Sequence, residues 1–325
     1  MSFKIEEIES LLSKVLDFKS ITAVKVIQSL WSGYGSLLSI QLEGATYGSV
    51  IVKWINLAAD VIIKRTWDSK FSHDRKLKSY QNEKIWYQYY AFLLNGFCKL
   101  PNYIGHEEEG DRLLLVMTNL NEEGFTDVRM NLAYDEVKTC LSWLANLHAF
   151  FLKDEITDLW EEGTYWHLAT RPDEFDAMDA GPLRDKAQYI DQALKSSKYL
   201  TVLHGDAKAA NFLFNKLNEV AAVDFQYTGI GCGMKDVVYL LSCLGEEMNE
   251  YLEEDYLAHY FTALREACTT CCIDINLNDL EENWRALYPF AWADFERFLE
   301  GWSPGHWKMT DYSNRLIEKA LATLK

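Results

Sequence analysis

The sequence has no long run of uncharged hydrophobic residues. Its longest such stretches, for example Val237 to Leu244, have the length of a strand or of a buried helix, whereas a helix that crosses a bilayer needs about 20 apolar residues. The first residues, MSFKIEEIES, also lack the basic segment and apolar core of a secretion signal. We therefore expect a cytoplasmic protein without a membrane partner.

Positive charge is scarce. There are 32 Lys and Arg against 49 Asp and Glu, which gives a formal net charge of −17. This sign repels phosphate backbones and anionic lipids and argues against a nucleic-acid partner. Residues 1–120 carry 14 basic and 13 acidic residues, so residues 121–325 carry 18 and 36, a net charge of −18. The acidic part either aids solubility or favours a bound cationic small molecule.

Cysteine is limited to seven residues, an odd number, which favours reduced thiols over a disulfide framework. Cys268, Cys271 and Cys272 lie close together in the sequence. A tetrahedral zinc site needs four ligands and no second Cys-x-x-Cys follows, so this group is more typical of a buried helix face.

The length of 325 residues, with 49% hydrophobic residues, suits a stable protein of two lobes. The first lobe begins with an amphipathic helix within residues 3–18 and continues with a basic solvated connection at 64–78 and a helix at 77–94. Its β-like segments are 23–30, 37–42, 49–55, 103–106 and 113–117.

Beyond Asn119 the pattern is mostly helical, with amphipathic runs near 183–196, 236–272 and 279–300. Another helix face gathers Leu141, Leu144, Ala145, Leu147, His148 and Phe151, where His148 is expected to be a packed core residue. Within this helical part, residues 212–214 and 220–223 are separated by a short polar turn. That pattern predicts a β-hairpin.

Three oxygen-bearing side chains lie near this hairpin. Asp206 follows His204-Gly205, Asn211 comes five residues after Asp206, and Asp224 comes thirteen residues after Asn211. A hairpin between Asn211 and Asp224 would bring both together, where Mg²⁺ could bridge them to nucleotide phosphates. Asp206 would lie nearby as a carboxylate that accepts a hydroxyl proton.

His-Gly-Asp, Asn at the fifth following position and Asp-Phe after a hairpin resemble the catalytic and metal-binding loops of the protein-kinase-like fold. The His-Gly-Asp form is similar to the aminoglycoside phosphotransferase and choline kinase superfamily. Asp-Phe-Gln at 224–226 and the segment 234–240 most resemble its ecdysteroid-kinase-like branch.

This resemblance implies an α+β, bilobal, protein-kinase-like fold. The expected N-terminal nucleotide-binding lobe, residues 1–119, is a small antiparallel sheet, and residues 120–325 form a larger, mostly helical lobe with the catalytic loop and the acceptor site. The implied cofactors are ATP and Mg²⁺, with Asn211 and Asp224 as metal ligands and Asp206 as the catalytic base. His204 is implied to brace the loop.

The resemblance also assigns residues of the first lobe. Lys53, at the end of Val50-Ile51-Val52-Lys53, is similar to the lysine that contacts the α- and β-phosphates, and Glu83 is its expected ion-pair partner. Residues 116–119, which include Met117 and Asn119, correspond to the segment that offers backbone hydrogen bonds to adenine. Taken alone, Lys53 and Glu83 would better suit a solvated strand edge and a solvated helix face, but together with the later loop the nucleotide-binding interpretation is favoured.

The turn at Gly33, Gly35 and Ser36 matches two glycines of the phosphate-covering loop. The third expected glycine is absent, because position 38 is Leu38. A lone Gly-x-Gly between strands is a weak signal by itself.

Two other polar residues have open roles. Lys208, inside the catalytic loop, either contacts the γ-phosphate or acceptor, as a second catalytic residue, or faces solvent. Asp236 fits an N-cap as well as the family's loop-bracing aspartate.

The sequence favours a small hydroxylated acceptor. Only eleven residues separate Asp224 from Asp236 and no Ala-Pro-Glu occurs, so a protein kinase's peptide-binding activation segment has no room. A nucleotide-binding pseudokinase is the alternative from another class, although the Lys, Asp, Asn, Asp set is intact. The family implies amino alcohols, aminoglycoside-like molecules or sterol-like alcohols as acceptors.

Aromatic residues near the C-terminus leave the charge of the acceptor open. Trp284, Tyr288, Trp292, Trp302 and Trp307 alternate with Asp294, Glu296 and Glu300. They either form a pocket for a cationic amine or fill the helical core, and the second reading is favoured.

Overall fold

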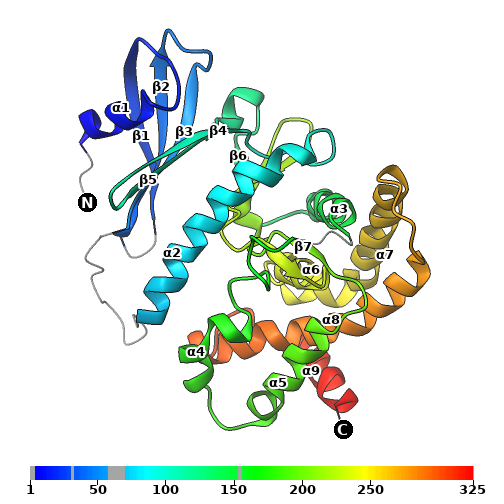
Figure 1. Cartoon of the computed structure of the whole chain (residues 1–325). Coiled ribbons are helices and arrows are strands. Elements are labelled where there is room, and N and C mark those ends of the chain that lie inside the picture. The colour runs from blue at the N-terminus through cyan, green and yellow to red at the C-terminus, as the bar shows by residue number, and fades with distance from the viewer. Residues whose placement is uncertain (1–3, 31–32, 58–69, 153–155, 325) are drawn as a thin grey trace. The chain divides into compact units, whose positions relative to one another are not determined.

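The computed structural model describes residues 4–30, 33–57, 70–152 and 156–324 (Figure 1). Two compact units make up the chain: Met1–Asn95 with Leu100–Thr126, and Gly96–Lys99 with Asp127–Lys325. The sequence places the boundary after Asn119, whereas residues 120–126 group with the first unit. Glu122 lies against that unit, since a Cβ at Gly48 would be 3.1 Å from Glu122 Oε1.

The first unit is built on a five-stranded antiparallel sheet. Its order is β1 (Ser20–Ser29), β2 (Gly35–Glu43), β3 (Ser49–Asn56), β5 (Arg112–Thr118) and β4 (Tyr103–Glu109). Side chains of β2 alternate between buried and less buried positions, as expected for a sheet with one covered face. The α+β class and the predicted small antiparallel sheet are confirmed.

Helix α1 (Ile5–Leu12) covers part of this sheet (Figure 1). Its residues Ile8, Leu11 and Leu12 are buried in one cluster with apolar residues of β2 and β3. The helix is shorter than the predicted 3–18. It ends at Leu12, and the apolar residues Val15, Leu16 and Phe18 that follow it pack onto the same cluster from outside the helix.

The next helix begins earlier than predicted. α2 spans Lys70–Ile85, followed by a π-helical turn at Trp86–Tyr90 and a 3₁₀ turn at Ala91–Leu94. The prediction of a solvated connection is therefore wrong for residues 70–78, because Lys and Arg are good helix formers and this basic segment is helical. Residues 64–69 of that stretch lie outside the described residues.

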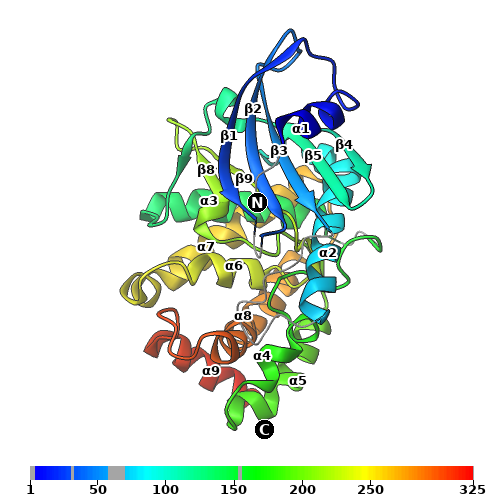
Figure 2. The same ribbon diagram turned by 90° about the vertical axis from the view of Figure 1, so that its left-hand side faces the viewer.

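The second unit is mainly helical. Its longer helices are α3 (Tyr134–Phe150), α5 (Pro182–Lys195), α6 (Met234–Leu241), α7 (Glu246–Thr270), α8 (Leu277–Trp302) and α9 (Asp311–Thr323), and α4 (Pro172–Asp176) is a single short turn. α3 packs on α7, and α8 packs on α5, α6 and α9. Figure 2 shows α8 beside α6 and α9. The predicted helical second part is confirmed.

The predicted run 236–272 consists of two helices. Asn249 Nδ2 donates to Leu241 O (3.0 Å), which satisfies a carbonyl at the end of α6, and Gly245 in extended geometry precedes α7. The chain turns between these positions because a side chain replaces the helical hydrogen bond.

Short strands position the loop of residues 204–211, the predicted catalytic loop. β7 (Thr201–Leu203) pairs with β10 (Gly229–Gly231), and β6 (Asp127–Val128), β8 (Phe212–Phe214) and β9 (Val220–Ala222) form an antiparallel sheet. The predicted hairpin is confirmed. Among the described residues, no helix is both long and apolar enough to cross a membrane.

Candidate active site

Asp206 lies in the loop between β7 and β8 and is only 7% exposed. Asn211 Nδ2 donates to its backbone O (2.8 Å) and to Oδ2 (2.9 Å), and Lys208 Nζ lies 2.9 Å from the same Oδ2. The second oxygen, Oδ1, is buried and has no hydrogen-bond partner among the described residues. One oxygen is thus held in place, while the other can accept a proton or a hydrogen bond from a ligand.

Lys208 interacts electrostatically with two carboxylates, Asp206 of the same loop and Asp224 after the hairpin. Burial lowers its pKa, but the charges of Asp206 and Asp224 outweigh burial and raise the pKa overall, so the ammonium form persists. Its side chain is 37% exposed. Lys208 therefore does not only face solvent, because it is paired with Asp206. Its contact with the γ-phosphate or the acceptor stays a prediction.

His204 braces the loop, as the resemblance implies. Its Nδ1 accepts a hydrogen bond from Asp206 N (3.2 Å), and Nε2 donates to Val223 O (3.1 Å). Burial lowers the pKa of the imidazole, which favours the neutral ring that this pattern requires. With both ring nitrogens occupied, His204 is unsuited to act as the base.

Asp236, on α6, holds the start of the same loop by hydrogen bonds to its backbone. Its carboxylate accepts hydrogen bonds from His204 N (2.6 Å) and Gly205 N (3.0 Å), and His148 Nε2 lies 3.2 Å from it. Gly233 is the N-cap of α6, so the N-cap interpretation of Asp236 is wrong and the loop-bracing one fits. His148 is fully buried, as predicted.

Gly205 is required by its backbone. Its φ is +80°, and a Cβ there would lie 2.0 Å from Tyr227 O. A larger residue would therefore displace the loop that carries Asp206.

The hairpin brings Asn211 and Asp224 together. Val223 N donates to Asn211 O (3.0 Å), immediately before Asp224, whose φ is +71°. Because Asn211 Nδ2 points to Asp206, its amide oxygen faces the other way, and the Asp224 carboxylate accepts from Gln226 Nε2 (2.7 Å). Amide and carboxylate oxygens are ligands that Mg²⁺ prefers, so the donor set fits this ion.

In the first unit, Lys53 and Glu83 form a buried ion pair. Nζ of Lys53 on β3 lies 2.6 Å from Oε2 of Glu83 on α2, and the side chains are 5% and 2% exposed. The prediction that they pair is borne out by this contact, and the solvated interpretation of both residues is wrong.

The turn before β2 requires glycine. At Gly35, φ is +156° and a Cβ would lie 1.9 Å from Trp54 O, and Gly33 has a φ of +79°. Ser36 is the next residue, in β2, and is largely buried. Leu38 takes the position of the third glycine because its side chain belongs to the sheet's buried cluster.

Met117 and Asn119 lie at the end of β5. Met117 is buried in the sheet opposite Ile51 and Tyr103. Asn119 Oδ1 accepts from Asn121 N (3.1 Å), which caps a 3₁₀ turn at Leu120–Glu123. The adenine contact of this segment stays a prediction.

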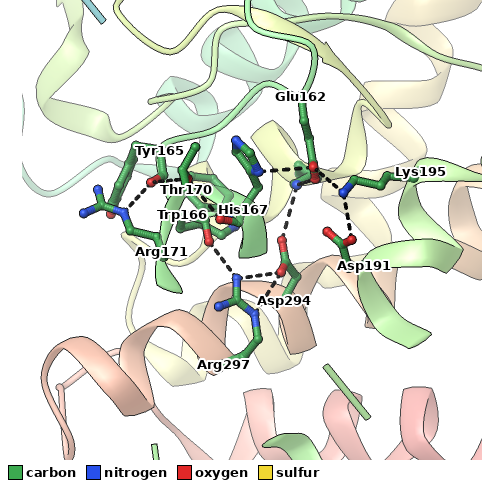
Figure 3. Close-up of polar contacts among 11 residues, drawn as sticks. Glu162, Tyr165, Trp166, His167, Thr170, Arg171, Asp191, Lys195, Asp294 and Arg297 are labelled. Atoms are coloured by element: carbon green, nitrogen blue, oxygen red, sulfur yellow. Dashed lines mark hydrogen bonds and ion pairs between the residues drawn. The ribbon is translucent and has the colours of Figure 1, made fainter. Parts of the chain in front are cut away.

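A buried ionic cluster links α6 to the segment before α4 and to α8 (Figure 3). Lys235 Nζ lies 2.9 Å from Glu162 Oε1 and 3.3 Å from Asp294 Oδ2. Burial lowers the pKa of Lys235, but the charges of Glu162 and Asp294 outweigh burial and raise the pKa overall, so the ammonium form persists. Lys235 directly precedes Asp236, which binds the backbone of residues 204 and 205. The cluster therefore fixes the start of α6 and, through Asp236, the start of this loop.

The neighbouring segment 165–171 is fixed by two arginines, and sequence analysis missed this arrangement. Arg297 NH2 donates to Trp166 O (2.6 Å) and to Asp294 Oδ1 (2.9 Å), and Arg171 Nε donates to Tyr165 O (2.6 Å) (Figure 3). None of these residues belongs to a motif, so only packing reveals them.

Most of the C-terminal aromatics are core residues, as the favoured interpretation predicted. Trp284, Tyr288 and Trp292 are buried in α8, whereas Trp307 is 62% exposed. Asp294 is paired with cations of the chain itself. In the described ranges, no group of three or more His, Cys, Asp or Glu is arranged to hold a metal, and this includes the cysteines at the end of α7.

Three of the solved structures that match this chain are described as a choline kinase and two aminoglycoside phosphotransferases. Choline kinase LicA from Streptococcus pneumoniae is 12% identical, with a TM-score of 0.46 over 98% of this chain and 99% of that one. Aminoglycoside phosphotransferase APH(3'')-Id from Streptomyces rimosus, in complex with ADP and streptomycin, is 12% identical, with a TM-score of 0.47 over 90% and 100%.

A third similar structure is an aminoglycoside phosphotransferase from Alicyclobacillus acidocaldarius. It is 12% identical, with a TM-score of 0.46 over 97% of this chain and 96% of that one. The comparison with curated proteins finds no match.

A family profile matches residues 48–268, more than half of the chain, from β3 to α7. The matched range includes the Lys53–Glu83 pair and the whole catalytic loop. This chain belongs to the phosphotransferase enzyme family.

Proposed function

We propose that this phosphotransferase transfers the γ-phosphoryl group of ATP to a hydroxyl group of a small molecule. The observation that carries the proposal is Asp206, whose Oδ2 is held by Asn211 and Lys208 while Oδ1 is buried without a partner among the described residues. A positioned carboxylate of this kind suits the acceptance of a hydroxyl proton as phosphoryl transfer proceeds.

The proposal assigns a role to each predicted site residue. Asp206 orients the acceptor hydroxyl and takes its proton, and Lys208 holds the Asp206 carboxylate and faces the transferred group. Asn211 and Asp224 would hold Mg²⁺, which would neutralise phosphate charge when bound. Lys53, oriented by Glu83, would contact the donor phosphates.

The turn at Gly33–Ser36 would cover these phosphates, and residues 116–119, including Met117 and Asn119, would contact adenine. Both assignments rest on the sequence resemblance. They complete the proposed nucleotide contacts of the first unit.

The proposed acceptor classes are amino alcohols, aminoglycoside-like molecules and sterol-like alcohols. The segment Asp224-Phe225-Gln226 further supports a place in the ecdysteroid-kinase-like branch. The short distance from Asp224 to Asp236 argues against peptide acceptors, and the retained Lys, Asp, Asn, Asp set argues against a pseudokinase.

The test is a phosphoryl-transfer screen with the full chain, ATP and Mg²⁺ on these alcohols and on serine and threonine peptides. We expect a phosphorylated alcohol, and Asp224→Ala should abolish its formation because the only charged ligand of the proposed metal is lost. Asp255→Ala, an exposed aspartate on α7, is the matched control and should behave like the wild type. Transfer to peptides alone, or full activity of Asp224→Ala, would contradict the proposal.

A further inference from the structure

Two tyrosine hydroxyls lie near the catalytic carboxylate. Tyr239 is on α6, three residues after the loop-bracing Asp236, and its hydroxyl is 3.0 Å from that of Tyr165. Burial raises the pKa of both phenols, and the negative charge of Asp206 raises each of them further. The backbone gives the geometric link, because Tyr165 N donates to the carbonyl oxygen of Gly205 (3.3 Å), the residue before Asp206.

Lys308 lies against the other side of Tyr239. It comes from the segment between α8 and α9, and its Nζ donates to Ser242 Oγ (3.0 Å) and lies 3.5 Å from Cys243 Sγ. The ammonium also lies over three aromatic rings, with Nζ 4.7, 5.4 and 5.6 Å from the ring centroids of Tyr239, Phe295 and Trp307.

No carboxylate within the described part of the chain forms an ion pair with Lys308. Other buried cations of this protein differ in this respect. Lys53 pairs with Glu83, Lys235 with Glu162 and Asp294, and Arg297 with Asp294. Burying an ammonium among neutral hydrogen-bond partners and aromatic rings costs desolvation free energy that no carboxylate offsets. An anion bound there would offset this cost.

The charges around Lys308 agree with a position beside the catalytic loop. Burial lowers the pKa of Lys308 overall, although Cys243 and Asp206 raise it in part, and Lys208 lowers it further. An anionic ligand would favour the ammonium form, and the contact of Lys308 with the ring of Tyr239 gives the geometric link to the loop.

The same geometry argues against a cationic acceptor at these rings. The faces of Tyr239, Phe295 and Trp307 are the surfaces on which a ligand ammonium would bind by cation–π attraction. The ammonium of Lys308 already occupies them. A second cation there would be repelled, whereas an anionic group would gain a charge-assisted hydrogen bond.

We propose that Lys308 binds an anionic group of the acceptor, a carboxylate, sulfate or phosphate, while the acceptor's aromatic or alicyclic body packs on Tyr165 and Tyr239 and its hydroxyl reaches Asp206. This inference rests on the proposed function and selects its substrate class. The acceptor is then a hydroxylated organic anion rather than an amino alcohol.

Binding of three matched probes to the full chain tests this inference. 4-(Hydroxymethyl)benzoate, 4-(hydroxymethyl)benzamide and 4-(hydroxymethyl)benzylamine share one body and one hydroxyl and differ in charge. We expect ligand-observed NMR to show the tightest binding for the carboxylate. Lys308→Met should weaken its binding by about tenfold or more, the usual loss for a charged hydrogen bond, and Lys308→Arg should retain it.

Lys319→Met, which removes an exposed lysine of α9, is the control and should leave the affinity unchanged. Tightest binding of the benzylamine, no binding of the benzoate to the wild type, or equal benzoate affinity in Lys308→Met would overturn the inference. An increase in the KM for ATP in Lys308→Met with every acceptor would assign the lysine to donor phosphate and would overturn it too. Lys308-dependent binding of the benzoate without any ATP-dependent transfer would instead count against the proposed function alone.

Discussion

Lys53 and Glu83 are withdrawn from water together, with a separation of 2.6 Å between Nζ and Oε2. Burying an ion is costly, and the mutual attraction of the pair offsets that cost. In the unfolded chain both charges are hydrated and this desolvation cost is absent. In the folded chain the opposite charge of the partner stabilises each ion between β3 and α2.

The single variants Lys53→Met and Glu83→Gln should each lower the free energy of unfolding by about 3–5 kcal/mol, because each removes the opposite charge that lies 2.6 Å from a buried ion. The double variant should lose less than the sum of the two. Urea unfolding of the four proteins gives this coupling directly, and Lys25→Met, on the exposed side of β1, serves as the control. Strictly additive losses would show that the two charges do not stabilise each other.

Residues in a local motif could be predicted from sequence, and residues brought in by packing could not. Asp206, Asn211 and Asp224 are tied together by one loop and one hairpin, so their spacing places them close together. Tyr165, Tyr239 and Lys308 come from three separate segments without a motif. The catalytic, metal and nucleotide roles assigned to the motif residues stay predictions until they are measured.

At the scale of elements, short apolar segments bounded by glycine-containing turns were sufficient to predict the strands of the first unit, of which β2 alternates and β3 and β5 are almost continuously buried. Helix ends were less predictable. The end of α1 and the break between α6 and α7 depend on tertiary contacts, such as the hydrogen bond from Asn249 to Leu241 O, that leave no periodic signal.

The packing of α8 on α9 includes a carboxyl group with an unusual titration. Burial raises the pKa of Glu296 to about 7, although a hydrogen bond with Ser313 lowers it. An unfolded glutamate has a pKa of about 4.3, so the folded state binds more protons than the unfolded state between these two values.

The contribution of Glu296 to stability is therefore present below about pH 4.3 and is lost as the pH rises toward about 7. Over this range it amounts to at most about 4 kcal/mol. Glu296→Gln should remove this loss, so its stability relative to the wild type should rise with pH. Unfolding curves at several pH values check this, with Glu318→Gln, exposed on α9, as the control. A difference from wild type that does not change with pH would refute the shift.

At the scale of the whole molecule, net charge gives little guidance to the local field. Residues 121–325 carry a net charge of −18, yet the side chains that contact the Asp206 carboxylate are the cation Lys208 and the neutral Asn211. The acidic excess could be counted from the sequence, but its position depends on which carboxylates the fold pairs or exposes. The expectation of a cationic acceptor rests on that count, and the contacts of Lys308 argue against it.

The division into two units was predicted from the change in pattern near Asn119, although the contacts group residues 96–99 with the second unit. Lys99 O accepts hydrogen bonds from Ala222 N (3.1 Å) and from Trp143 Nε1 (2.9 Å), which ties this short segment to β9 and α3. Such an exchange of a few residues between units has no compositional signal.

The central claim is that Asp206 is the base of a phosphoryl transfer, and the most direct measurement compares the wild type with Asp206→Asn. Once an acceptor is found, kcat for its phosphorylation should fall by about 10²–10⁴-fold, the usual effect of removing a positioned base. The Kd for ATP with Mg²⁺ should stay the same, because the amide keeps the shape of the carboxylate, and Asp255→Asn should match the wild type in both values. An unchanged kcat in Asp206→Asn would contradict the account.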